Sequence, residues 1–340
     1  MLIFSNRLVH FPLPGILQGL LTPVAYDDWV RVKAWALYKR DKKRGLPAAL
    51  NGSIGLYKET VNGSVAASGP LDPYTGDILA WNLIGAWDPE KAKIDCGYVK
   101  QFYLMPTVDH IDPCADTLAF EICSWEVNCC KSFLNPVEFL DMCGKVIKRW
   151  EKILKMEFRS EKPENGFPAI YPLPPFLQGV CTPAQYEKWL LTRAKELYKR
   201  DKKMGRACAV QSSRSLYRRA IHAAACASGP LDPYTGDALT WNLIGKWDAA
   251  KGNDDHDIFR KEFTLLPTVD HIDPEMKDLD FEICSWLINC CKSGRTPEEF
   301  IGLCGKVVRW KAPPEIPPAC AGAPAGRPQG EQRINFGYWY

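Results

Sequence analysis

The chain has 340 residues, 46% of them hydrophobic and 24% charged, and this ordinary globular composition excludes a fibrous or wholly disordered protein. Its formal net charge of +3 is too small to indicate a nucleic-acid partner unless the charges gather on one surface. No apolar run approaches the ~20 residues of a membrane span, and the first ten residues lack the apolar core of a signal peptide, so we expect a cytoplasmic protein.

Most of the chain is an internal repeat present in two copies. Residues 37–43 recur without change at 197–203, and residues 67–77 recur at 227–237. A period of this length, present twice, is typical of tandem domains rather than of a solenoid. We therefore expect a first repeat over residues 11–150, a linker over 151–170, a second repeat over 171–310, and a Pro/Ala/Gly-rich, disordered tail over 311–340.

Each repeat is predicted to open with a helix that ends in a basic cluster. Thr22 and Thr182 each precede a proline, as an N-cap does, and an apolar stripe at helical spacing then runs towards Gly205. The basic cluster has two interpretations, a solvated end that complements the helix dipole or a contact to phosphate groups. The candidate nucleic-acid contacts are Lys39, Arg40, Lys42 and Lys43 in the first repeat and Lys199, Arg200, Lys202 and Lys203 in the second.

The elements that follow are predicted in the same order in both repeats. A second helix covers about 53–67 and 213–227, and the turn-rich segment 69–77 suits a hairpin. In the first repeat we expect a strand over 103–108, a loop of about six residues, a strand over 120–125 and a helix beginning at Asn128. The last helix is signalled by Asn135 before a proline and by a capping box that begins at Thr296.

The sequence after the first strand contains an Asp-His pair in each copy, followed 18 residues later by Asn. The pairs are Asp109-His110 and Asp270-His271, and the asparagines are Asn128 and Asn289. Carboxylate, imidazole and amide oxygen are the groups that converge on one divalent ion and one phosphate in a one-metal nuclease site. The alternative is a turn in which the aspartate caps the backbone and the histidine is a surface residue. The remaining histidines, His10, His222 and His256, have no counterpart in the other repeat.

Three segments together carry a family resemblance. Tyr74–Asp77, Val108–Pro113 and Asn128–Ser132, with their second copies, resemble the HNH (ββα-metal) endonuclease family. They are especially similar to the HNH domain of RNA-guided CRISPR nucleases, and the order of motifs is similar to that of uncharacterised bacterial HNH-like proteins. The resemblance implies an α+β fold of two tandem repeats, each a ββα-metal core with flanking helices.

The resemblance also implies roles for the paired residues. Asp109, Asp270, Asn128 and Asn289 would hold Mg²⁺ or Mn²⁺, and His110 and His271 would act as general bases in the hydrolysis of DNA phosphodiester bonds. Lys131 and Lys292 lie one helical turn beyond the asparagines and are expected to meet a phosphate. The family pattern often has His or Asn at these two positions. Asp112 and Asp273 are interpreted either as extra ligands or as turn caps.

The expected partner is DNA, or alternatively RNA, with the chain acting as a monomer that forms an internal pseudo-dimer. An alternative function is a non-catalytic nucleic-acid-binding or scaffold protein that retains the HNH fold. The 14 cysteines include no Cys-x-x-Cys pair, so we expect buried structural thiols and no structural zinc. The paired tryptophans are expected in the core; they are Trp29/Trp189, Trp81/Trp241, Trp125/Trp286 and Trp150/Trp310.

Overall fold

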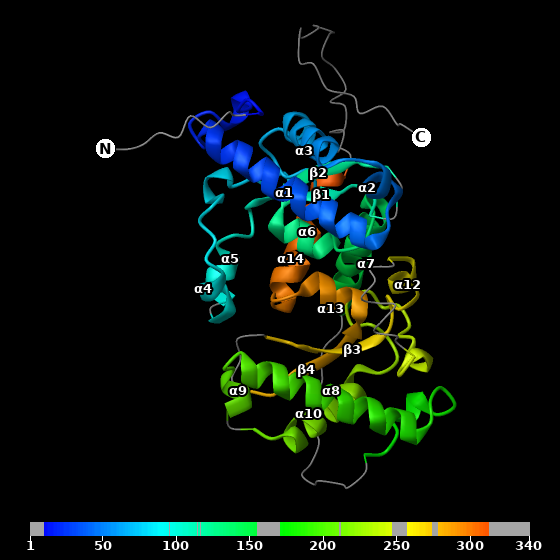
Figure 1. Ribbon diagram of the computed structural model, residues 1–340. Coiled ribbons are helices and arrows are strands. Elements are labelled where there is room, and N and C mark those ends of the chain that lie inside the picture. The colour runs from blue at the N-terminus through cyan, green and yellow to red at the C-terminus, as the bar shows by residue number, and fades with distance from the viewer. Residues whose placement is uncertain are drawn as a thin grey trace, which may run out of the picture.

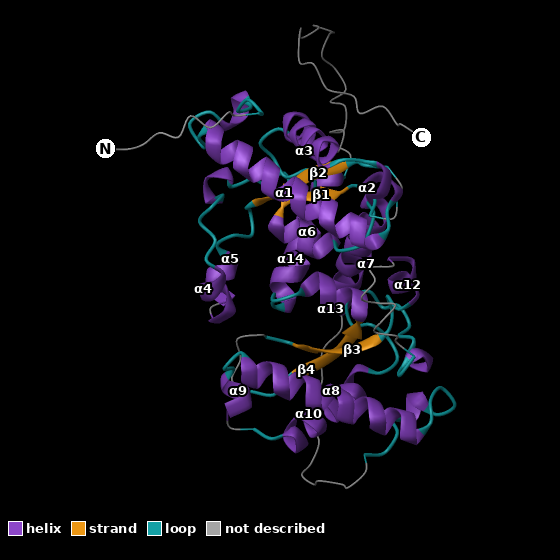
Figure 2. Ribbon diagram, viewed as in Figure 1, coloured by secondary structure: helices purple, strands orange, loops and turns teal. Residues whose placement is uncertain are grey.

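The computed structural model describes residues 10–94, 96–113, 115, 117–154, 171–210, 212–246, 257–273 and 278–312. These residues form a mixed α+β structure with one antiparallel two-stranded sheet in each half of the chain (Figures 1 and 2). Most of the expected linker and tail, together with His256, lies outside the described residues. In the parts of the chain that are described, no helix is both long and apolar enough to cross a membrane.

The elements of the two halves follow the same order, except that α4 has no counterpart among the described residues of the second half. The first half contains η1 (Gly15–Leu17), α1 (Pro23–Arg44), α2 (Pro47–Asn51), α3 (Ile54–Ser68), η2 (Trp81–Leu83), α4 (Pro89–Ile94), α5 (Cys96–Lys100), β1 (Pro106–His110), β2 (Phe120–Ser124), α6 (Trp125–Lys131) and α7 (Pro136–Ile153). The second half contains η3 (Pro175–Leu177), α8 (Pro183–Lys203), α9 (Ala207–Val210), α10 (Arg214–Ser228), η4 (Trp241–Leu243), α12 (Asp257–Glu262), β3 (Pro267–His271), β4 (Phe281–Ser285), α13 (Trp286–Lys292) and α14 (Pro297–Lys311).

The predicted helix starts are confirmed by their caps. The Thr22 hydroxyl accepts a hydrogen bond from the backbone of the first turn of α1, and Thr182 forms a full capping box at the start of α8. Asn135 and Thr296 do the same for α7 and α14. The second predicted helix of each half is α3 or α10, each within one or two residues of its expected bounds.

The strands and the helix after them are displaced from their predicted positions. β1 begins at Pro106 rather than at residue 103, so Asp109 and His110 lie within the strand, and the connection to β2 is longer than the six residues expected. α6 begins at Trp125 because the Ser124 side chain caps it, which puts Asn128 in the middle of the helix instead of at its start. The turn-rich segment 69–77 is closed by a single bridge rather than by a longer hairpin.

Each half has its own hydrophobic core, in which a long helix and a second helix pack together and the second helix packs on the sheet. In the first half α1 packs on α3, and α3 packs on β2; α8, α10 and β4 repeat this arrangement in the second half (Figure 1). Trp29, Trp81, Trp189 and Trp241 are buried as predicted. Trp310 departs from the prediction because it is 50% exposed and lies against Gly76 of the first half instead of filling a core.

A third hydrophobic core is shared by the two halves. It is built from α6 and α7 of the first half packed on α13 and α14 of the second, which occupy the middle of the molecule (Figure 1). The prediction of buried thiols is confirmed here for Cys130, Cys143, Cys291 and Cys304. Two equivalent ion pairs flank this core, Lys100 with Glu299 at 2.7 Å and Lys261 with Glu138 at 2.6 Å. The halves are therefore related as the subunits of a symmetric dimer are.

Candidate functional site

A cavity of about 240 Å³ in the first half brings together the three residues that the sequence analysis selected there. Asp109 and His110 come from β1 and Asn128 comes from α6. The same cavity is lined by cationic side chains from the end of α1 and from α12 of the second half, namely Arg40, Arg44 and Arg260. Three guanidinium groups around one carboxylate, one imidazole and one amide favour an anionic ligand, and planar guanidinium groups match phosphate oxygens well.

His110 is held by a carboxylate that sequence analysis did not select. Its Nε2 lies 2.9 Å from Oδ2 of Asp41, which also accepts a hydrogen bond from the Tyr57 hydroxyl at 2.9 Å. Burial opposes ionisation of Asp41, but His110, Tyr57 and Arg40 together outweigh it, so the pKa of Asp41 lies below its usual value. An ionised Asp41 accepts a hydrogen bond from the Nε2–H group of His110, and with this tautomer the ring lone pair lies on Nδ1.

The Nδ1 atom of His110 lies 2.7 Å from a guanidinium nitrogen of Arg40. The Arg40 side chain is 44% exposed, whereas His110 is 3% exposed and packs edge-on against Phe120. The long arginine can therefore turn outwards while the imidazole stays fixed between β2 and α1. This arrangement orients one ring nitrogen towards the cavity, as the carboxylate does for the histidine of a hydrolase triad.

Asp109 belongs to a buried chain of polar groups. Its Oδ2 accepts a hydrogen bond from Nζ of Lys131 at 2.8 Å, and the same ammonium donates to the carbonyl of His110 at 2.7 Å. Across the sheet, Glu121 pairs with Asp109 in register, lies 3.5 Å from Lys131 and accepts a 2.6 Å hydrogen bond from the Tyr74 hydroxyl. Burial raises the pKa of Glu121 to about 7, although Lys131 and Tyr74 favour its charged form.

Asn128 is oriented by the strand beneath it. Its Nδ2 donates a 2.9 Å hydrogen bond to the Thr107 hydroxyl, so the amide oxygen is the atom available to a cation in the cavity. Asp109 and Asn128 thus offer two oxygen donors to a hard divalent ion, and such an ion keeps most of its waters. The ammonium of Lys131 offsets part of the charge that would attract that ion.

The second half repeats most of these contacts. Its equivalent groups are Asp201, Tyr217, Asp270, His271, Glu282, Tyr234, Asn289 and Lys292. Nε2 of His271 lies 2.9 Å from Asp201, and Lys292 donates to Asp270 at 2.9 Å. Burial raises the pKa of Glu282 to about 7 as well. One local difference is that Cys208 joins Asp201 and His271, and their potential metal-ligand atoms lie within 4.8 Å of one another.

The structure places the remaining predicted residues in two groups. Lys131 and Lys292 have no exposed surface and are bonded to aspartates, so they do not present an ammonium group to a phosphate outside the protein. The predicted basic clusters are exposed at the ends of α1 and α8. Several of these lysines lie over aromatic rings, including Lys39 over Trp35 and Lys42 over Tyr38.

The sequence contains one signal that identifies the missed carboxylate. Ala34, Leu37 and Asp41 share one face of α1, and all three are buried. An aspartate at a position where helical periodicity requires an apolar residue indicates a buried polar partner. Asp201 continues the apolar stripe of α8 in the same way. Arg260 carries no such signal, because it reaches the first-half cavity from the other half of the chain.

Comparison with known proteins gives no match: no family model, no curated protein and no solved structure matches the chain. A functional assignment therefore depends on the chemistry of these side chains and on the motifs that place them.

Proposed function

We propose that the chain is a metal-dependent endonuclease that hydrolyses DNA phosphodiester bonds, with β1, β2 and α6 as a ββα-metal core of HNH type. The observation that carries the proposal is the meeting of Asp109, His110 and Asn128 in one cavity with three arginines. Each residue type has a distinct task in phosphodiester hydrolysis, and the arginines supply charge where a phosphate would lie. The expected cofactor is Mg²⁺ or Mn²⁺.

Asp109 and Asn128 are the residues that would hold the metal ion. A bound divalent ion would stabilise negative charge on the leaving oxygen. Lys131 fixes the rotamer of Asp109 through Oδ2 and leaves the other carboxylate oxygen to the ion. Because this ammonium is buried beside the ligand, we expect modest metal affinity at rest and tighter binding once a phosphate contributes its own charge.

His110 would act as the general base through Nδ1. An incoming phosphodiester offers Arg40 an anionic partner with two unesterified oxygens, so the guanidinium group leaves Nδ1 and binds the phosphate oxygens. Nδ1 is then able to accept a proton from the attacking water, and Asp41 stabilises the charged ring that results. Arg40 is in this proposal both a phosphate ligand and a cap on the base in the absence of substrate.

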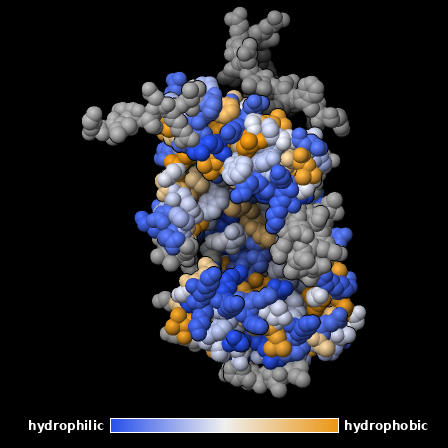
Figure 3. Space-filling model, viewed as in Figure 1, coloured by the Kyte–Doolittle hydropathy of each residue, from blue (hydrophilic) through white to orange (hydrophobic). Residues whose placement is uncertain are grey.

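The exposed basic clusters would provide the sequence-independent part of DNA binding. They lie at the ends of α1 and α8, and Arg40 links the first cluster directly to the cavity. Figure 3 shows hydrophilic residues on both halves, on either side of a hollow between them. Lysine and arginine side chains at such positions bind the phosphate backbone by releasing counterions.

The test is cleavage of supercoiled plasmid with Mg²⁺ or Mn²⁺, with and without EDTA. The double variant His110→Ala/His271→Ala should reduce the rate by about 10² or more, the usual effect of removing a general base. Lys145→Ala, which lies in an exposed ion pair with Asp237, is the control and should leave the rate unchanged. If the double variant cuts as fast as the parent, the assigned site is wrong.

The contact between Lys131 and Asp109 favours a second candidate, a nucleic-acid-binding protein that retains this fold without turnover. In that case the ammonium group would replace the metal ion permanently, and the arginines would bind the DNA backbone. Salt-dependent DNA binding without cleavage under any divalent metal would support this candidate over the nuclease.

A further inference from the structure

The sites of the two halves differ in two respects: Arg44 and Arg260, which line the first cavity, are replaced by Met204 and Val99 at the equivalent positions of the second site, and the corner after the long helix has different residues. Directly after α1 the first half has Leu46 and Ala48, and the equivalent positions after α8 hold Arg206 and Cys208. The groups around this corner are otherwise shared, because each histidine lies beside an aspartate, an arginine of the preceding helix and a phenylalanine of the sheet. The substitutions at this corner therefore leave the histidine and its aspartate, arginine and phenylalanine neighbours in place.

Arg206 fills the second site with a guanidinium group. Its NH1 lies 3.2 Å from Oδ1 of Asp201 and 3.1 Å from Nδ1 of His271. Arg200 also approaches Nδ1, at 3.3 Å, but its side chain is 50% exposed whereas that of Arg206 is 20% exposed. NH1 of Arg206 also lies 3.2 Å from Nε2 of His271, so it sits over the imidazole ring rather than in line with the Nδ1 lone pair, while it donates a hydrogen bond to the buried Asp201.

The first site has Leu46 at the position of Arg206, and its cavity arginines are Arg40, Arg44 and Arg260. Among the described residues, Oδ1 of Asp41 is buried and accepts no hydrogen bond, although its counterpart on Asp201 accepts one from Arg206. Arg40 is then the group within hydrogen-bond distance of Nδ1 of His110, and it lies at the edge of the cavity. Arg40 lies 3.8 Å from Oδ1 of Asp41 but is 44% exposed, so a phosphate can draw it away, whereas Arg206 is 20% exposed and donates a 3.2 Å hydrogen bond to the buried Asp201.

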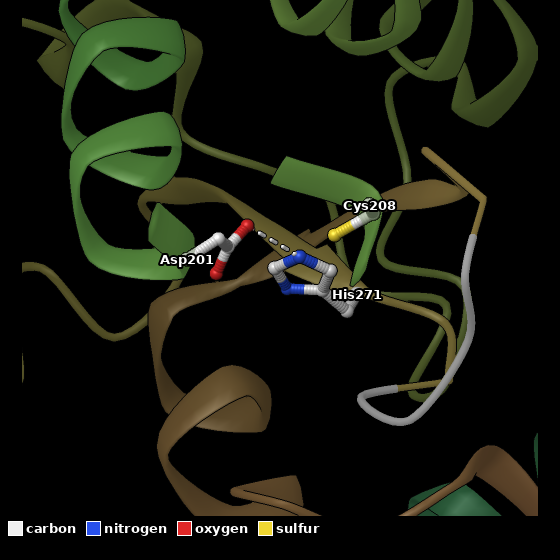
Figure 4. Close-up of side chains that lie close together, drawn as sticks. All are labelled: Asp201, Cys208 and His271. Atoms are coloured by element: carbon white, nitrogen blue, oxygen red, sulfur yellow. Dashed lines mark hydrogen bonds and ion pairs between the residues drawn. The ribbon is translucent and has the colours of Figure 1, made fainter. Parts of the chain in front are cut away.

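The side chains around Arg206 are themselves good ligands for a transition metal. Asp201, Cys208 and His271 point towards one another and are all buried (Figure 4). Carboxylate, thiolate and imidazole are the usual donors to zinc or cobalt. The guanidinium group of Arg206 lies beside Asp201 and His271, two of these three potential ligands. Its positive charge excludes a metal ion from the same space.

We propose that Arg206 closes the second site by taking the place of a cation between Asp201 and His271, so that the first site alone is competent for cleavage. This inference rests on the proposed nuclease function and makes it asymmetric: the chain would nick one strand rather than cut both. His110 and His271 would then have unequal roles although both stand in the same Asp-His motif.

The decisive experiment exchanges the differing corner residues. In a His110→Ala background, Arg206→Leu/Cys208→Ala gives the second site the corner of the first and should restore nicking to at least ~10 times the His110→Ala rate. Arg214→Leu, an exposed arginine at the start of α10, is the matched control and should restore nothing. In the parent background, Leu46→Arg should slow nicking. Retention of folding in every variant is checked by circular dichroism.

The inference is overturned if His110→Ala alone leaves about half of the parent rate, because the second site would then work with Arg206 in place. It is also overturned if the folded exchange variant stays inactive while the parent cleaves.

A second readout does not depend on cleavage. Arg206→Leu alone should bind one Co²⁺ with a thiolate charge-transfer band, and the parent and Arg206→Leu/Cys208→Ala should not. A thiolate charge-transfer band of equal strength in the parent contradicts the inference, because Cys208 supplies the thiolate and Co²⁺ at Asp109 and Asn128 gives no such band. If the parent does not cleave DNA but the cobalt result is as expected, the proposed nuclease function is wrong. The exclusion of a metal ion by Arg206 would still be supported.

Discussion

Substitution of Lys131 is the most direct test of the buried hydrogen-bonded network that includes Asp109 and Glu121. The Lys131 ammonium has no exposed surface and lies 2.8 Å from Asp109, 2.7 Å from the His110 carbonyl and 3.5 Å from Glu121. Lys131→Met keeps the aliphatic part of the side chain and removes the charge. The carboxylate of Asp109, whose side chain is 8% exposed, then loses its partner. Removal of one member of a buried ion pair costs about 3–5 kcal/mol of folding free energy.

The size of this loss should depend on pH. The pKa of Glu121 is about 7 in the folded protein, so at pH 6 this carboxyl group is mostly neutral and the variant leaves one unpaired negative charge. At pH 8 Glu121 is mostly ionised in the parent, but the variant lacks the ammonium that favours this charge, so it must either keep Glu121 protonated or leave two carboxylates facing each other. The loss should therefore be near the lower end of the range at pH 6 and near the upper end at pH 8.

Urea unfolding of the parent and of Lys131→Met, followed by tryptophan fluorescence at both pH values, measures the loss directly. Lys145→Met is the control, because Lys145 is 44% exposed in its ion pairs and should cost at most about 1 kcal/mol. In a double-mutant cycle, Asp109→Leu/Lys131→Met should cost less than the sum of the single variants. If Lys131→Met lowers the free energy of unfolding no more than Lys145→Met does, the buried ion pair of Lys131 and Asp109 is refuted.

Two further predictions follow from the same side chains. Since burial raises the pKa of Glu121 and Glu282 from 4.5 to about 7, each stabilises the fold fully below pH 4.5 and loses that contribution as pH rises through 7. Glu121→Gln/Glu282→Gln should flatten this part of the profile of unfolding free energy against pH, and an unchanged slope would assign it to other groups. Purified protein should contain no stoichiometric zinc by elemental analysis and should stay folded in EDTA, because Arg206 lies among the clustered ligands. One zinc per chain would contradict this and identify Asp201, Cys208 and His271 as ligands.

Local chemistry explains what could be predicted from the sequence. The helices that follow Thr182 and Thr296 begin where side chains within three residues form a capping box. The sequence therefore predicts these starts without any tertiary contact. The Asp-His and Asn positions could be selected because the repeat preserves them in register, and the structure brings the first set into one cavity. The start of β1 could not be placed, since strand pairing with β2 decides it rather than local propensity.

Tertiary packing explains what could not be predicted. Lys131 was expected to face a phosphate, but the cross-strand pair of Asp109 and Glu121 draws its ammonium inside. Trp310 was expected in a core, but the packing of α14 against the first half leaves it half exposed over Gly76. The Lys131 contact depends on strand pairing within the first half and the Trp310 contact on how the two halves meet, and neither spacing nor composition contains that information.

The core shared by α6, α7, α13 and α14 has a consequence for how such a chain can evolve. In a dimer of identical subunits, every substitution occurs in both copies, so a change that disables one site disables the other. Here the two copies belong to one polypeptide and are joined by a common apolar core. Arg206 and Cys208 could therefore arise in one copy while Leu46 and Ala48 persisted in the other. Covalent fusion releases the two copies from enforced identity and lets each acquire residues that the other lacks.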